Sequence, residues 1–122
     1  MTKCACSKAP KLIFPCSGAS DVGELSDRTG RRLTKLGLGK MYCLAGIGGE
    51  VNDILVNTRA ADKILAIDGC KLDCAKMTLE KAGFTAFDHI RLENEGFKKG
   101  ESQANGENIE KCINLAKEFL NV

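Results

Sequence analysis

The chain has 122 residues, enough for one domain with its own hydrophobic core. Its 18 basic and 16 acidic side chains give a net charge of +2, which provides no electrostatic footprint for nucleic acid or for a membrane surface. No apolar run reaches the roughly 18 residues of a membrane span, and the start, MTKCACSKAPK, lacks the hydrophobic stretch of a signal peptide. We therefore expect a cytoplasmic protein, with no nucleic-acid or membrane partner, whose seven cysteines stay reduced.

The first strand and helix follow a short N-terminal segment. We expect residues 1–10 to form a tail and residues 11–122 to form a single α/β domain. The apolar run KLIFPC at 11–16 predicts a strand. A helix then starts at Asp21, in a capping-box-like pattern, and apolar residues keep helical spacing until Gly37.

The strand and helix pattern then repeats three times. In the second unit, the sequence predicts a strand at 40–45, a turn at GIGG (46–49) and a helix at 51–58. The third unit is a strand at 63–67 and a helix between Asp73 and Gly83. The fourth is a strand at 87–92 and an amphipathic helix whose apolar residues run from 109 to 120. The strand KILAI is apolar without alternation, which is typical of a parallel strand covered on both faces. Short connections and right-handed crossovers predict a three-layer α/β sandwich, in which a four-stranded parallel sheet has the Rossmann-like or flavodoxin-like order 2-1-3-4.

Four cysteines fall at one edge of this predicted sheet. Cys16, Cys43 and Cys70 are 27 residues apart, which is the length of one strand and helix unit here. Each therefore lies at or near the carboxyl end of its strand, and Cys74 joins them from the first turn of the next helix. Open α/β sheets build their sites at this edge. The gap within CKLDC also lies in the range common for paired zinc ligands, so metal binding and thiol chemistry are the leading interpretations.

Several motifs together resemble the DGC domain family. They are FPCSGAS (14–20), the cysteine of MYCLAGIGG (41–49), AIDGCKLDCAK (66–76) and, more weakly, GFKK (96–99), and they span most of the chain. The resemblance implies Zn²⁺ chelation by four cysteines, at the positions of Cys16, Cys43, Cys70 and Cys74. It supplies a ligand set and no reaction.

A thiol-based enzyme, or a sulfur- or redox-sensing protein, is the main alternative. Cys16 and Cys74 would lie near positive helix ends, which lower a thiol's pKa and make it nucleophilic. Against this, CKLDC is one residue longer than a CxxC redox motif, and Val22 stands where a cysteine phosphatase loop requires arginine. Simple burial as small hydrophobic groups is another interpretation of these thiols, and it is our expectation for Cys112 on the last helix.

Backbone amides of SGAS and GIGG make a small anionic ligand a third candidate, although both segments lack a nucleotide-binding fingerprint. The polar loop at 94–106 starts at the cysteine edge, and it is interpreted either as a lid carrying Lys98 and Lys99 or as an ordinary solvated loop. Cys4 and Cys6 precede the first strand and are expected in the tail.

Three further features are expected to be structural. Asp68 is expected to bond backbone amides of its turn rather than to support a ligand. His89, on the edge strand, is expected to be exposed. The basic residues Arg28, Arg31, Arg32 and Lys35 are expected to form a solvated helix face.

Overall fold

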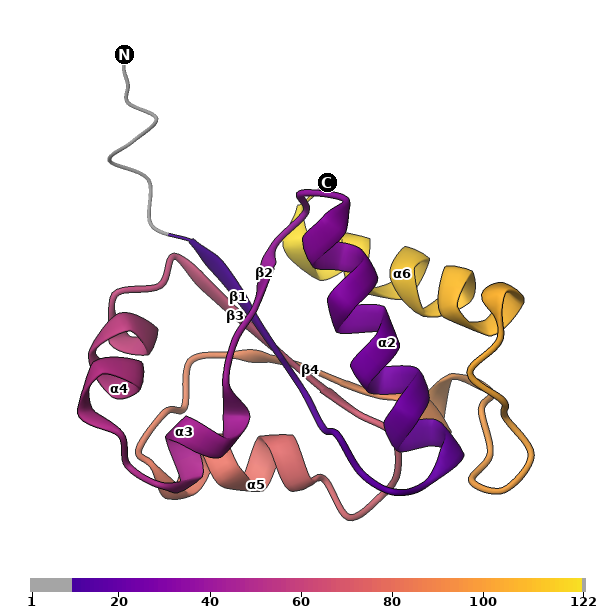
Figure 1. Cartoon of the computed structure of the whole chain (residues 1–122), viewed down its shortest axis with the longest axis horizontal. Helices are drawn as coiled ribbons and strands as arrows, with labels where there is room; N and C mark the ends of the chain where they lie inside the picture. The colour runs from indigo at the N-terminus through magenta and orange to yellow at the C-terminus, as the bar shows by residue number, and fades with distance from the viewer. Residues whose placement is uncertain (1–9, 122) are drawn as a thin grey trace.

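The computed structural model describes residues 10–121 (Figure 1). The elements are β1 (Lys11–Pro15), α2 (Asp21–Lys35), β2 (Lys40–Met41), α3 (Leu44–Gly48), α4 (Asn52–Arg59), β3 (Lys63–Asp68), α5 (Cys74–Lys81), β4 (Asp88–Arg91), the 3₁₀ helix η1 (Leu92–Glu95) and α6 (Gly106–Leu120). None of these helices has the length and apolar character needed to cross a bilayer. Cys4, Cys6 and nearly all of the expected tail lie outside the described residues.

The four strands form one parallel sheet in the order β2-β1-β3-β4. The central pair is in register from Lys11 opposite Lys63 to Pro15 opposite Ile67. The predicted fold class and strand order are therefore confirmed. Because all strands run the same way, their carboxyl ends meet at one edge, the lower edge in Figure 1.

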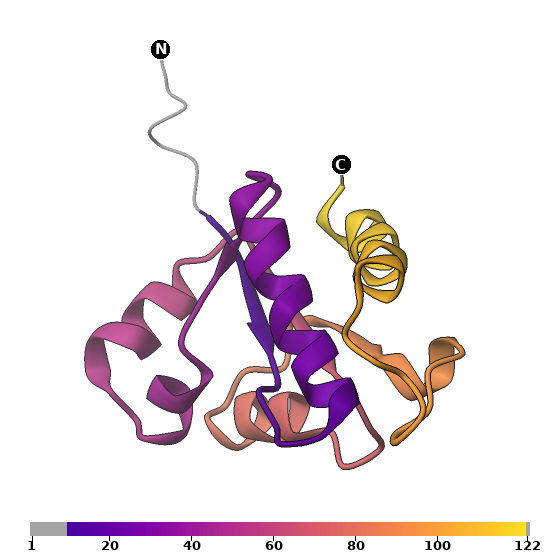
Figure 2. The same cartoon turned by 45° about the vertical axis from the view of Figure 1, so that its right-hand side comes forward.

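Helices cover both faces of the sheet because side chains of the central strands alternate between two hydrophobic clusters. Ile13 and Leu65 point to one face and pack with α2 and α6. Leu12 and Phe14 point to the other, where α3, α4 and α5 cover them. Figure 2 shows the two groups of helices on opposite sides of the strands. All four of these side chains are at most 1% exposed, so each face has its own closed core.

The predicted strand at 40–45 and the predicted turn at GIGG are wrong in detail. Strand β2 ends at Met41, and the segment from Leu44 to Gly48 is the short helix α3. The N–H of Gly46 donates to Cys43 Sγ at 3.3 Å, which caps the helix. A Cβ at position 46 would lie 2.7 Å from the side chain of Ile54, so glycine lets α3 pack closely against α4.

The predicted last helix is present, and it begins before Ile109, the first residue of its apolar face. It begins at Gly106 because the side chain of Asn105 accepts a hydrogen bond from the N–H of Asn108, at 2.9 Å. Such an N-cap satisfies one of the free amides of the first turn. The apolar face then buries Cys112, as expected, and burial raises the pKa of this thiol to about 11.

Candidate functional site

The cysteines of the central motifs lie at the carboxyl edge of the sheet. Cys16 directly follows β1, Cys70 comes two residues after β3, and Cys74 is the first residue of α5. These three side chains line one pocket of about 790 Å³, together with the SGAS segment and Lys99. Three of the four predicted ligand residues therefore line one hollow.

Cys43 lies beside this pocket rather than in its lining. It is the exposed N-cap residue of α3, and the following residues Leu44 and Ala45 do line the pocket. Within residues 10–121, one group of three potential ligand atoms has all its members within 4.8 Å of one another, and it contains no cysteine. The four sulfur atoms thus share an edge without forming a closed ligand set in this structure, and their common coordination of a metal stays a prediction.

Cys16 is a partly buried thiol of the pocket. Its Sγ accepts a hydrogen bond from the N–H of Gly69 at 3.2 Å, across from β1 to the end of β3. Burial raises the pKa of the Cys16 thiol, and the bond from Gly69 opposes this shift without cancelling it. A thiol with a raised pKa is a poor nucleophile at neutral pH, which weakens the enzyme interpretation for Cys16.

Gly69 is required by the close packing of this loop on the first turn of α2. A Cβ at position 69 would lie 2.5 Å from the carbonyl oxygen of Val22 and 2.9 Å from the nitrogen of Gly23. Both atoms belong to a helix backbone that cannot move aside without breaking hydrogen bonds. The glycine of the AIDGC motif therefore brings the Cys70 segment against the helix that follows Cys16.

Asp68 fixes the start of α5 and hence the position of Cys74. The side chain is 1% exposed; its Oδ1 accepts from the N–H of Ala75 at 2.7 Å and its Oδ2 accepts from the N–H of Lys76 at 3.0 Å. A carboxylate at this place satisfies free amides of the first turn and matches the positive end of the helix dipole. The expected bonding to backbone amides is confirmed, although the amides belong to α5.

Asp73 and His89 complete a polar network behind Asp68. Asp73 occupies the expected N-cap position, but its φ is +52°, its side chain makes no cap bond, and its carboxylate instead binds the guanidinium of Arg91. Arg91 holds the pKa of Asp73 below its ordinary value. The expected exposure of His89 is wrong, because its side chain is 20% exposed and Nε2 lies 2.9 Å from Asp68 Oδ2.

This network contains the one group of ligand-type atoms mentioned above, formed by Asp68, Asp73 and His89. Each carboxylate already accepts hydrogen bonds from an amide or a guanidinium, so the network acts as a support for the loop between β3 and α5. Sequence reasoning missed Arg91. The available signal was a charged residue at the end of the predicted fourth strand. In the parallel sheet, Arg91 lies directly opposite Asp68 at the end of β3.

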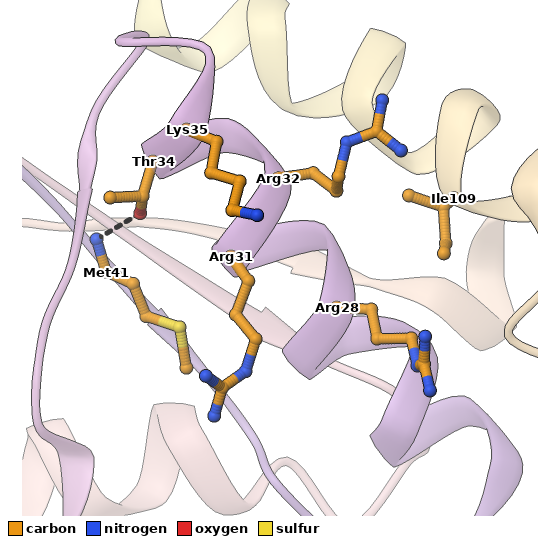
Figure 3. Close-up of a pocket in the computed structure, with 7 residues that line it drawn as sticks. All are labelled: Arg28, Arg31, Arg32, Thr34, Lys35, Met41 and Ile109. Carbon is orange, nitrogen blue, oxygen red and sulfur yellow. Dashed lines mark hydrogen bonds between the residues drawn. The ribbon is translucent and has the colours of Figure 1, made fainter.

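A second hollow, of about 590 Å³, lies along α2 (Figure 3). No cysteine of the described residues lines it. Its lining residues are Arg28, Arg31, Arg32, Thr34, Lys35, Met41 and Ile109. The charged ends spread to both sides of the helix rather than meeting at one point (Figure 3). Arg28 and Arg31 are also paired with Glu24 and Asp27, one turn earlier. This is the expected solvated helix face.

The fold and the pocket define an α/β domain with a cysteine-lined site at the carboxyl edge of a parallel sheet. The chain belongs to the DGC domain family, whose sequence model matches residues 12–115, so the resemblance noted from the motifs is confirmed. A curated relative, "Anaerobic and virulence modulator AnvM" of Pseudomonas aeruginosa, is 38% identical over 88 residues, which cover 72% of this chain and 67% of that protein. No solved structure gives a significant match.

Proposed function

We propose that this protein binds Zn²⁺ through the thiolates of Cys16, Cys43, Cys70 and Cys74 and that the metal serves a regulatory role. The observation that carries the proposal is the pocket lined by three of these side chains, with the fourth on the adjoining helix cap. Sulfur ligands favour zinc among the common divalent metals.

The chain's own residues prepare such a site. Gly69 donates to Cys16 Sγ, and the carboxylate of Asp68 holds the helix start that carries Cys74. When bound, zinc with four thiolates forms a closed tetrahedral centre that offers no open position for a substrate. Cys43 is exposed, which supports its being the ligand that joins last.

A regulatory use fits better than a purely structural one. The two hydrophobic clusters close both faces of the sheet, so this fold does not depend on a metal for its core. The curated relative is named a modulator, which is consistent with a regulatory role. A cytoplasmic location, where thiols remain reduced, is part of the same proposal.

Metal analysis tests the proposal. Protein purified without added zinc should contain one zinc per chain, and X-ray absorption at the zinc edge should report four sulfur ligands. Serine at any of the four positions should reduce zinc content or affinity, whereas Cys112→Ala, which changes the buried cysteine of α6, should not. Protein without bound metal whose four thiols all titrate would refute the proposal. Three sulfurs and one light atom would instead indicate an open, catalytic centre.

A thiol enzyme acting through Cys74 is the second candidate. Cys74 is exposed and is the first residue of α5, so it is an accessible thiol at the start of an eight-residue helix. Rapid alkylation of Cys74 at neutral pH in zinc-loaded protein would favour this function. A small anionic ligand in the pocket is a related candidate, supported by Lys99 in the lining.

A further inference from the structure

The loop at 96–102 is anchored to the start of α2 by a single carboxylate. Both side-chain oxygens of Asp21 lie 2.9 Å from the N–H of Gly100, and Oδ2 also accepts from the N–H of Ser102 at 2.9 Å. These bonds join parts of the chain about 80 residues apart. Sequence reasoning assigned Asp21 only to the helix start, so its role toward the loop is additional.

Further contacts give this loop a defined shape. Ser102 is 6% exposed and its Oγ accepts from the N–H of Lys98 at 2.7 Å, while Phe97 is buried in the core cluster under α2 and α6. Gly100 has a φ of +92°, which side-chain-bearing residues rarely adopt. The loop is therefore a fixed turn with a buried base, rather than a solvated connection.

This shape gives two neighbouring lysines different surroundings. Lys99 lines the cysteine pocket, and its Nζ lies 3.9 Å from Cys70 Sγ. Lys98 is 75% exposed and its Nζ lies 3.4 Å from the carboxylate of Glu101, within the loop. One ammonium thus faces a thiol of the site, and the other does not.

We propose that Asp21 is a positioning residue that, through the loop at 96–102, holds the Lys99 ammonium beside Cys70. The proposal deepens the proposed function and rests on it for the role of Cys70 as a zinc ligand. Four thiolates and one Zn²⁺ carry a net charge of −2, and an adjacent ammonium offsets part of that charge. In the absence of metal, the same ammonium attracts anionic reagents to Cys70.

Alkylation of the full chain, freed of metal by a chelator, tests the position of the charge. Iodoacetate is anionic and iodoacetamide is neutral, and both attack the same thiolate. The rate with iodoacetate divided by the rate with iodoacetamide at Cys70, measured by peptide mass spectrometry, therefore reports the local charge and not the thiolate fraction. Lys99→Ala should lower this ratio about fourfold, the effect of one unit charge at about 5 Å in a water-like dielectric. Lys99→Arg and the matched control Lys98→Ala should leave it close to the wild-type ratio.

The role of Asp21 is tested by combining variants. Asp21→Asn should lower the ratio as Lys99→Ala does, and the double variant should show no further fall, because Asp21 acts through Lys99. An unchanged ratio in either single variant, or an additional fall in the double variant, would overturn the proposal. If Asp21→Asn fails to fold, Ser102→Ala loosens the same loop without altering α2. In Ser102→Ala, a fall in the rate ratio smaller than that of Lys99→Ala supports the proposal, and an unchanged ratio overturns it. Because the assay uses metal-free protein, its result can be interpreted even if the protein proves not to bind zinc.

Discussion

Replacement of Asp68 by alanine removes the buried carboxylate that holds the first turn of α5. Two backbone amides, of Ala75 and Lys76, lose an acceptor at 2.7 and 3.0 Å. Hydrogen bonds to charged groups contribute about 1.5–3 kcal/mol each, and a buried donor left without a partner costs about 1–3 kcal/mol. Since these contributions overlap, we expect Asp68→Ala to lower the free energy of unfolding by about 3–5 kcal/mol, a large part of the usual stability of a domain.

Urea unfolding of the metal-free protein measures this change, provided that the slope with denaturant stays constant. Asp88→Asn is a matched control, because Asp88 on β4 is 40% exposed and lies 3.4 Å from Lys63 Nζ in a surface ion pair. The control should cost less than about 1 kcal/mol. A loss below about 1 kcal/mol in Asp68→Ala would show that water or a shifted side chain replaces the carboxylate, and the reasoning about α5 would be wrong.

Two more predictions concern the neighbouring packing and the effect of pH. Gly69→Ala should lower the free energy of unfolding in urea by at least about 2 kcal/mol, because its Cβ would lie 2.5 Å from a carbonyl oxygen of α2. Gly106→Ala should change it little, because apart from its own helix backbone and chain neighbours no atom lies within 4 Å of the added Cβ. Equal decreases in the two variants would contradict this packing. Hydrogen bonds from the loop amides hold the pKa of Asp21 below its ordinary value of 3.8, so this stabilisation is present above that pH and is lost as the pH falls through the lowered pKa. The melting temperature of Asp21→Asn should therefore lie below that of the wild type at pH 7, and the difference should shrink as the pH falls below 3.8. A constant difference would exclude the titration of Asp21 as the cause.

The sheet order and the edge that carries the cysteines followed from the sequence, because short connections and apolar runs are local patterns. The helix α3 did not, since the glycines of LAGIG are typical of a turn, and the close packing of Gly46 against Ile54, which explains the first of them, is a tertiary contact. The long-range bonds that organise the site also have no local signature. Asp21 meets Gly100 across 79 positions of the chain, and no sequence pattern records that pairing.

The beginning and the end of the domain meet at the sheet edge opposite the cysteines. The ammonium of Lys11, at the start of β1, contacts the carbonyl oxygen of Leu120, at the end of α6, and the five residues of β1 span about 17 Å from this edge to the other. A tether, dye or fusion partner attached where the chain passes residue 11 or residue 120 is thus directed away from the thiols. Attachment at residue 11 or residue 120 leaves the pocket open to solution, and a reporter pair at these two places senses unfolding without touching the site.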